Sequence, residues 1–330
     1  MSYLNREQIK TLIKCGQIYS NKSINKNQIQ PASLDLTLSD KCYRIKASFI
    51  PNNIKISNVI KELSLSRVNL NINTLLEKNC IYLCELNEKL KLPKDIMGKS
   101  NPKSTTGRLD IFTRVITENG KEYDNIKYNY KGKLYLEIIP QSFSIIVKRN
   151  ISLNQLRFFK GANEKNRIKK INISVAIKKN SISAYKAKKI TSAIDLNKIN
   201  FYKSNKYWEK IIPKNNYFII ERDEFYILRS KESIKIKNNQ AAELEPFKDS
   251  FGNFRVHYAG FFDPGFGNNR FGTPAVLELR AYDTPFIIRD GQLVGQQNYY
   301  QIDEIKNQSY GSKINSNYFN QNLKLAKQFK

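Results

Sequence analysis

The residues best suited to chemistry lie in two short segments near the middle of the chain. Lys103–Arg108 (KSTTGR) combines two cations, three hydroxyl groups and a glycine. Hydroxyls and backbone N–H groups direct donors at phosphate oxygens, glycine lets the backbone come close, and arginine adds a two-pronged contact. The segment therefore favours a loop that binds a polyphosphate, although an ordinary polar turn before a strand would have the same composition.

The second segment, Lys133–Pro140 (KLYLEIIP), carries one carboxylate, Glu137, on an otherwise apolar strand. Strict alternation places Tyr135 and Ile139 on the same face as Glu137. A buried carboxyl there would suit proton transfer, whereas an exposed glutamate on a half-buried strand is the alternative that alternation alone favours. Taken together, the two segments indicate hydrolytic chemistry on a nucleotide.

Length and charge narrow the class of protein. A chain of 330 residues favours two domains. It contains neither a run of eighteen apolar residues nor an apolar N-terminal signal, so we expect a cytoplasmic protein without a membrane span. The net charge of +27 raises the question of nucleic-acid binding. Lysine is spread along the whole chain together with Asn and Ile, which indicates a codon bias, so nucleic acid is not the expected partner.

Cysteine and histidine usage argues against a metal centre. The four cysteines are too few and too scattered for a disulfide scaffold, so we expect reduced thiols in the core; they are Cys15, Cys42, Cys80 and Cys84. A zinc-dependent deaminase needs a His-x-Glu motif and paired cysteines, but His257 is the single histidine. No Walker-type phosphate loop is present either.

The pattern along the chain predicts a mainly β protein. Residues 5–16 predict a short amphipathic helix, with apolar side chains at 9, 12 and 13 and a glycine stop at Gly16. The segments that follow are short, rich in β-branched or aromatic residues, and separated by Pro, Asn and Gly. They predict an all-β sandwich or barrel, with strands at 41–49, 80–86, 134–139 and 143–147.

A loose internal repeat predicts two copies of one β-fold. Glu137 is matched by Glu278, and a glutamine follows each glutamate at the same distance, at Gln155 and Gln296. Two further matches keep the same order: 31–36 with 191–196, and 143–146 with 286–288. We place the domain boundary near residue 170, within the basic polar stretch 160–189, which gives domains 1–170 and 171–330.

These segments resemble the dCTP deaminase family of the dUTPase-like superfamily, and more narrowly its long bacterial form with two fused domains. The matching residues are 29–36 (IQPASLDL), 103–109 (KSTTGRL), 130–137 (YKGKLYLE), the Asp-Pro-Gly turn at 263–265 and 291–296 (GQLVGQ). The resemblance covers nearly the whole chain. It implies two tandem dUTPase-like (β-clip) barrel or sandwich domains with a short N-terminal helix.

The resemblance also implies an activity: zinc-free hydrolytic deamination of dCTP to dUTP and ammonia, with Glu137 activating water. Magnesium would arrive with the triphosphate and need no protein ligand. The residues implied for the triphosphate are Lys103, Ser104, Thr105 and Arg108, and those for the base and sugar are Val115, Ile116, Thr117 and Gln155. In the family, sites are usually built between domains of a threefold ring, so self-association as a trimer is expected, and dTTP is a candidate inhibitor.

The second domain departs from the family pattern. Residues 240–245 (QAAELE) stand where the first domain has its Ser/Arg loop, and acidic side chains there would repel a triphosphate. We therefore expect a degenerate copy that either stabilises the assembly or lends a wall to the site. The candidate contributors to such a wall are Ala259, Gly260, Asp263, Glu278 and Gln296. The cluster at 256–267 is either the wall of a sugar or base pocket or a tight turn at Asp-Pro-Gly flanked by core aromatics.

Two alternatives to simple deamination remain open. Hydrolysis of dUTP to dUMP, alone or after deamination, is the nearest, because 259–263 (AGFFD) resembles the turn that positions water in that chemistry. A non-catalytic nucleotide- or nucleic-acid-binding module on the same fold belongs to another class. Whether the polar, basic C-terminal segment 310–330 closes over bound nucleotide is a further open question.

Overall fold

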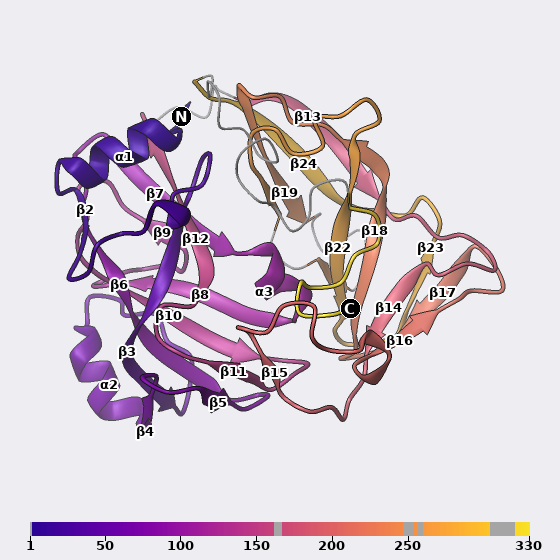
Figure 1. Ribbon diagram of the computed structural model, residues 1–330, viewed down its shortest axis with the longest axis horizontal. Coiled ribbons are helices and arrows are strands. Elements are labelled where there is room, and N and C mark those ends of the chain that lie inside the picture. Colours follow the sequence, from indigo (N-terminus) through magenta and orange to yellow (C-terminus); the bar gives the residue numbers. More distant parts are fainter. Residues whose placement is uncertain (1, 162–166, 247–253, 257–259, 304–320) are drawn as a thin grey trace. The chain divides into compact units, whose positions relative to one another are not determined.

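The structure, a computed structural model, describes the chain except for residues 1, 162–166, 247–253, 257–259 and 304–320 (Figure 1). It divides into two compact units. Unit 1 comprises Met1–Asn166 together with Ser192–Asn197, and unit 2 comprises Arg167–Thr191 together with Lys198–Lys330. Both units are built mainly from β-strands, which confirms the predicted fold class.

Unit 1 contains a ten-stranded sheet and a three-stranded sheet within its described part. The central path of the larger sheet runs β8-β10-β6-β3-β12-β7-β9, and β15-β11-β5 form the smaller one. The elements of unit 1 are β1 (Ser2–Tyr3), α1 (Arg6–Lys14), β2 (Ile18–Ser20), η1 (Lys26–Gln28), β3 (Leu34–Ile45), α2 (Ile56–Leu63), β4 (Ser64–Asn69), β5 (Thr74–Leu76), β6 (Ile81–Lys91), β7 (Ile96–Pro102), α3 (Ser104–Arg108), β8 (Ile111–Thr117), β9 (Asn125–Ile126), β10 (Lys131–Pro140), β11 (Ile145–Val147), β12 (Ser152–Lys160) and β15 (Ile194–Asp195).

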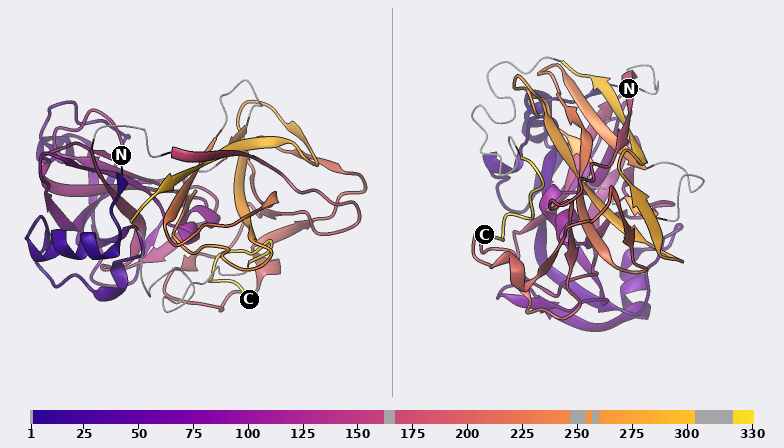
Figure 2. Two further views of the ribbon diagram at one scale, coloured as in Figure 1. Left: turned by 90° about the horizontal axis from the view of Figure 1, so that it is seen from above. Right: turned by 90° about the vertical axis from the view of Figure 1, so that its right-hand side faces the viewer.

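The predicted N-terminal helix is present as α1, outside the strands of unit 1 in Figure 1 and in the left view of Figure 2. Asn5 caps its N-terminus by accepting hydrogen bonds from the N–H groups of Glu7 and Gln8, each at 3.1 Å. Gly16 follows the helix with a φ of +67°, the left-handed conformation that glycine adopts without strain. The sequence thus specified both ends of this helix.

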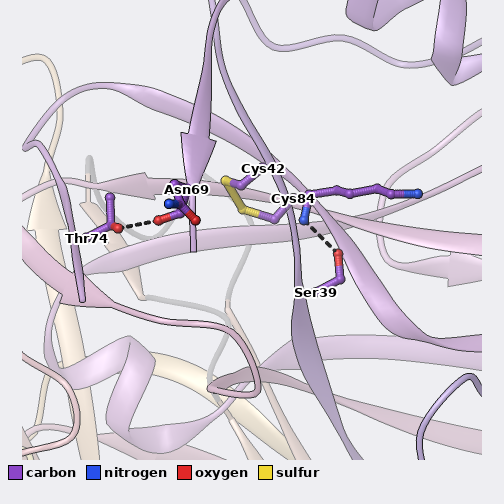
Figure 3. Close-up of a disulfide and its surroundings, with 6 residues drawn as sticks. Ser39, Cys42, Asn69, Thr74 and Cys84 are labelled. Atoms are coloured by element: carbon purple, nitrogen blue, oxygen red, sulfur yellow. Dashed lines mark hydrogen bonds between the residues drawn. A yellow bond between two sulfur atoms is a disulfide. The ribbon is translucent and has the colours of Figure 1, made fainter. Parts of the chain in front are cut away.

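Cys42 and Cys84 form a disulfide that joins β3 to β6 (Figure 3). The two residues are direct partners in the antiparallel register of these strands, with their Cα atoms 4.0 Å apart. The expectation of reduced core thiols is therefore wrong for this pair. Cys15 and Cys80 are free, as expected, but Cys15 is exposed and Cys80 is half-buried, so neither is a core thiol.

Unit 2 has three sheets in its described part: β13-β24-β19-β21, β16-β14-β18-β22-β20 and β17-β23. Its buried core includes Ile173, Tyr226, Leu228, Leu277 and Leu279. The elements of unit 2 are β13 (Arg167–Ser174), β14 (Ala184–Ala187), η3 (Ser204–Lys206), β16 (Trp208–Ile211), β17 (Tyr217–Ile220), β18 (Phe225–Ile234), β19 (Gln240–Pro246), β20 (Phe254–Val256), β21 (Phe261–Phe262), β22 (Thr273–Ala281), β23 (Phe286–Arg289) and β24 (Leu293–Gln301).

The strand order of unit 1 recurs in unit 2. In unit 1, β10 lies between β6 and β8, and β12 lies between β3 and β7. In unit 2, β22 lies between β18 and β20, and β24 lies between β13 and β19. Glu137 on β10 and Glu278 on β22 thus occupy matching central strands, as do Gln155 on β12 and Gln296 on β24.

One of the predicted repeats is wrong. Ile194 and Asp195 form β15, which pairs in parallel with β11 inside unit 1. The strand that borders β24 as β3 borders β12 is β13, which lies in the basic polar stretch 160–189 where the domain boundary was placed. Its polarity is misleading because buried Ile173 and part-buried Ile171 alternate with exposed side chains such as Asn172.

Among the described residues, no helix is long and apolar enough to cross a membrane.

Candidate active site

Glu137 is fully buried in the middle of β10, with 0% of its surface exposed. The residue opposite it on β8 is Arg114, whose Nε and Nη2 donate hydrogen bonds of 2.8 and 2.5 Å to the same carboxylate oxygen, Oε1. The other oxygen, Oε2, is buried and accepts no hydrogen bond from any described residue. The expectation of a buried carboxylate is confirmed, but the carboxylate has a cationic partner.

Sequence reasoning missed Arg114. The ion pair depends on strand pairing, because the antiparallel register of β8 and β10 brings residues 114 and 137 to the same face of the sheet. A signal existed in the segment 111–117 (IFTRVIT), where one cation interrupts an apolar strand. Pairing that strand with Lys131–Pro140 would have found it.

The Glu137–Arg114 pair lies beside apolar and aromatic side chains. The guanidinium carbon of Arg114 is 3.9 Å from the ring centroid of Tyr123 and 4.8 Å from that of Phe112. Burial, as the largest effect, raises the pKa of the Tyr123 hydroxyl. The same face of the sheet continues into a buried cluster that includes Ile116 and Tyr135, where α2 contributes Ile56. Water is scarce in such surroundings, so the hydrogen bonds of the pair are strong.

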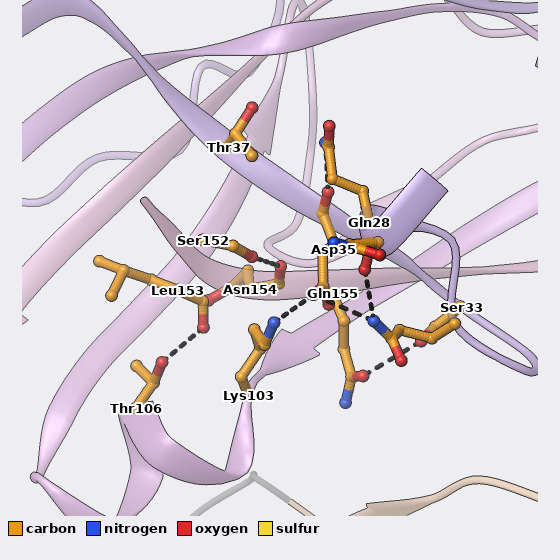
Figure 4. A network of polar contacts seen from close by, with 12 residues as sticks. Gln28, Ser33, Asp35, Thr37, Lys103, Thr106, Ser152, Leu153, Asn154 and Gln155 are labelled. Carbon is orange, nitrogen blue, oxygen red and sulfur yellow. Dashed lines mark hydrogen bonds and ion pairs between the residues drawn. The ribbon is translucent and has the colours of Figure 1, made fainter. Parts of the chain in front are cut away.

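The predicted phosphate loop forms one short helix, α3. Lys103 precedes it and forms an ion pair with Asp35 of β3, while the Thr106 hydroxyl donates a 2.7 Å hydrogen bond to the backbone oxygen of Leu153 (Figure 4). Thr106 is therefore committed to holding α3 on β12. Ser104 and Thr105 are half-buried, as is Lys103, whereas the rest of the loop is buried.

Arg108 ends α3 and is buried, with 3% of its surface exposed. It is thus part of the folded interior of unit 1, unlike the half-exposed Lys103. A direct contact between Arg108 and a triphosphate stays a prediction.

Gln155 lies in the same polar network as Lys103. Its neighbour across the strands β12 and β3 is Asp35, and its Oε1 accepts a 3.2 Å hydrogen bond from the Ser33 hydroxyl (Figure 4). The structure thus brings Lys103, Asp35 and Gln155 together. Within the described residues, the Glu137 carboxylate accepts hydrogen bonds from Arg114 alone, so the predicted site residues of this chain form two separate hydrogen-bonded groups.

The predicted base-contacting residues Val115, Ile116 and Thr117 are all buried on β8. Val115 and Asp124 are joined by two hydrogen bonds: the Val115 N–H donates to the side-chain oxygen Asp124 Oδ1 at 2.8 Å, and the Val115 backbone oxygen accepts the Asp124 N–H at 2.9 Å. The side chain of Ile116 lies in the buried cluster. Burial, the largest of several effects, raises the pKa of the Asp124 carboxyl to about 7. A contact between these residues and a base is untested.

The predicted contributors from unit 2 that the structure describes lie on different elements. Ala259 and His257 lie outside the described residues. Glu278 is buried on β22 with 5% exposed, whereas the Gln296 side chain donates a 3.2 Å hydrogen bond to Asn172. Asp263 begins a tight turn in which its backbone oxygen accepts the Phe266 N–H at 3.1 Å.

Gly260 has a structural reason to be glycine. A Cβ atom on this residue would lie 2.5 Å from the Cβ of Leu244, because β21 and the chain before it approach β19 closely. The Leu244 N–H also donates a 2.6 Å hydrogen bond to the Gly260 oxygen. The glycine at this position is thus explained by packing.

Among the described residues, no group of three or more His, Cys, Asp or Glu side chains is placed to hold a metal ion. Cys42 and Cys84 are bonded to each other, which removes both as thiolate ligands in this state.

The repeated β-fold and the buried glutamate on a central strand of unit 1 define a class of protein with two tandem β-domains and a carboxylate at its candidate site. Comparison with known proteins gives the family. The family model for the 2'-deoxycytidine 5'-triphosphate deaminase (DCD) N-terminal domain matches residues 2–162, and the model for the C-terminal domain matches residues 148–329. The chain belongs to the 2'-deoxycytidine 5'-triphosphate deaminase family.

Individual relatives agree with this assignment. A crystal structure of 2'-deoxycytidine 5'-triphosphate deaminase from Agrobacterium tumefaciens matches with a TM-score of 0.86 and 38% identity, over 91% of this chain and 99% of that one. Curated proteins named "dCTP deaminase, dUMP-forming" match over 42% of this chain. The one from Methanocaldococcus jannaschii is 29% identical over 73% of its length, and the one from Methanosphaera stadtmanae is 28% identical over 68%.

Proposed function

We propose that this protein catalyses the hydrolytic deamination of dCTP to dUTP and ammonia. The observation that carries the proposal is the state of Glu137. It is fully buried, one of its oxygens is held by Arg114, and the other has no donor among the described residues. It lies in the part of the chain that matches the deaminase N-terminal domain. A sheltered carboxylate with one open oxygen is suited to take up and return protons.

The reaction needs one group that moves protons in two steps. Glu137 takes a proton from water as the water oxygen bonds to C4 of the cytosine, and gives that proton to N3. It then takes the proton of the new hydroxyl group and gives it to the amine, so that the C4–N bond breaks and ammonia leaves. The carboxylate is restored, and the sum is dCTP plus water giving dUTP plus ammonia. The proposal uses no zinc, in keeping with the single histidine of the chain.

Recognition of the triphosphate is assigned to Lys103, Ser104 and Thr105, with Arg108 behind them. Ser104 and Thr105 are half-buried and carry hydroxyl donors, and Lys103 supplies a half-exposed cation next to Asp35. Magnesium enters as part of the substrate, bound to the phosphates. The charged tail then anchors the base while the chemistry takes place elsewhere on the nucleotide.

A second candidate reaction is hydrolysis of the dUTP product to dUMP and pyrophosphate. The names of the archaeal relatives, "dCTP deaminase, dUMP-forming", favour it. In this reading, water attacks phosphorus and pyrophosphate leaves. Asp263 is the candidate for positioning that water, and a trimer would supply the residues that one chain does not bring together. Inhibition by dTTP would use the same nucleotide site.

Product analysis tests both reactions. Purified protein is incubated with dCTP and magnesium, with and without a zinc-selective chelator, and the products are separated by anion-exchange chromatography. Ammonia and dUTP in equal amounts, insensitive to the chelator, are expected. Ammonia with dUMP and pyrophosphate would establish the two-step reaction. No turnover, combined with DNA affinity that falls steeply with salt, would favour a binding module instead.

A further inference from the structure

The contact between Arg114 and Glu137 is one-sided. A guanidinium commonly meets a carboxylate with one donor on each oxygen. Here Nε and Nη2 both donate to Oε1, at 2.8 and 2.5 Å, while Oε2 is buried without a donor among the described residues. The arginine therefore occupies one oxygen and leaves the other for a different partner.

Two aromatic rings hold the guanidinium in this geometry. Tyr123 and Phe112 lie against Arg114, with their ring centroids 3.9 and 4.8 Å from its Cζ. Ring faces attract the cation without offering a strong acceptor, so the in-plane N–H donors stay directed at Glu137. Only 21% of the Arg114 side chain and 0% of the Glu137 side chain are exposed, so the ion pair is largely sheltered from bulk solvent.

We infer that Arg114 is a positioning residue for the reacting water, an inference that rests on the proposed deamination. Its positive charge lies against Oε1 of the Glu137 carboxylate, and Oε2 is left as the proton-accepting oxygen. When Oε2 takes the proton of water, Oε1 remains bound to the arginine. The new carboxylic acid therefore cannot rotate away before it passes the proton to N3.

The test compares Arg114→Met with Arg114→Lys. Methionine keeps much of the side-chain length but removes the charge and both donors, while lysine restores the charge without the two-donor geometry. We expect kcat for dCTP deamination to fall about 100-fold in Arg114→Met and less in Arg114→Lys, with KM changed by less than about threefold. Arg44→Met is the matched control, because Arg44 pairs with Glu77 in an exposed bridge.

The pH profile separates positioning from general structural support. Without the cation the buried carboxyl keeps its proton to higher pH, so the acid limb of kcat/KM should move up by about one pH unit or more in Arg114→Met. Among the described residues, the other titratable groups beside the pair include Tyr123, Asp124 and, two residues along the same face of β10, Tyr135. The profile is therefore repeated in Asp124→Asn, which cannot titrate there.

An infrared measurement keeps this inference separate from the proposed activity. At about pH 6 we expect Arg114→Met to show the infrared band of a protonated carboxyl group, and the wild type to lack it. The double variant Arg114→Met/Glu137→Gln should also lack the band, which would identify Glu137 as its source. If the wild type does not deaminate dCTP but the band behaves this way, the proposed function fails and the charge control by Arg114 stands.

Three outcomes would overturn the inference. They are an unshifted acid limb, a change confined to KM, and the absence of the band from a folded Arg114→Met. If that variant does not fold, Tyr123→Leu and Tyr123→Phe replace it. Loss of the ring should shift the acid limb upward, whereas loss of the hydroxyl alone should leave the profile unchanged, and equal profiles would reject the inference.

Discussion

Thr37 and Glu88 in unit 1 are joined by the same two hydrogen bonds as Ser174 and Glu232 in unit 2. The backbone N–H of the hydroxyl residue donates to Oε2 of the glutamate at 2.8 Å in both units. Its side-chain hydroxyl donates to Oε1 at 2.7 Å in unit 1 and 2.6 Å in unit 2. The pair links β3 to β6 in unit 1 and the end of β13 to β18 in unit 2, so the repeat extends to individual polar contacts.

Glu88→Gln should destabilise the protein more than Glu232→Gln. Glu88 is 1% exposed and also accepts a 2.8 Å hydrogen bond from Gln28, whereas Glu232 is half-buried. An amide presents donors where the native site supplies donors, so we expect a loss of about 1–3 kcal/mol of unfolding free energy at Glu88 and under about 1 kcal/mol at Glu232. Urea denaturation measures both, with exposed Glu7→Gln as the control. Equal losses would contradict this account.

Glu137→Gln should lower deamination at least about 100-fold and leave dCTP affinity within a few-fold of the wild type. The substitution keeps the shape of the side chain but removes the proton-accepting oxygen. Initial rates of ammonia release and calorimetric binding of dCTP provide the two measurements. Glu77→Gln, at an exposed carboxylate of the same unit, is the control. Full activity in Glu137→Gln would remove the proposed mechanism.

Arg108→Ala should weaken dCTP binding by about 1.5–3 kcal/mol if its guanidinium forms a sheltered, charge-assisted contact with phosphate. Because Arg108 is buried, the melting temperature must be measured alongside. Lys103→Ala removes a half-exposed cation instead and tests the loop with less structural disturbance. Deoxycytidine, which lacks phosphate, is the control ligand, and an equal loss of affinity for it would reject a phosphate contact.

Asp124→Asn should change how stability depends on pH. Burial raises the pKa of Asp124 to about 7 from the ordinary value of 3.8, so the folded protein holds a proton that the unfolded chain has lost. The stabilisation of the folded protein by this proton is complete below about pH 4 and is lost as the pH rises through about 7. Asparagine stays neutral, can accept the Val115 N–H and tolerates the φ of +61° at this position.

The difference in unfolding free energy between Asp124→Asn and the wild type should therefore move in favour of the variant by up to about 1.4 kcal/mol per pH unit between pH 4 and 7. Guanidinium denaturation at a series of pH values measures it. A difference that is flat across this range would show that Asp124 does not titrate in the folded protein.

Local patterns predicted the features that depend on neighbouring residues. The amphipathic helix at 5–16, its glycine stop at Gly16 and the strand around Glu137 each depend on neighbouring residues, and the structure confirms all three. The matching glutamates at 137 and 278 also lie on matching strands, because a repeat preserves spacing within each copy.

What the sequence did not disclose depends on strand pairing. Arg114 lies opposite Glu137, and Cys42 lies opposite Cys84, only because of the register between strands that are distant along the chain. A single sequence does not contain that register. The apparent match of Asp195 to Asp35 failed for the same reason, since similar letters in the two segments concealed different pairing partners.

The placement of β15 has a practical consequence for dissecting the molecule. Ile194 and Asp195 follow the first strands of unit 2 in the chain, yet they form the parallel edge beside Ile145 and Ile146 of unit 1. A fragment that stops at residue 166 would therefore leave β11 with an uncovered side that invites aggregation. Because residues 192–197 belong to unit 1, no single cut in the chain separates the two units intact. A recombinant form of unit 1 therefore needs residues 192–197 as well.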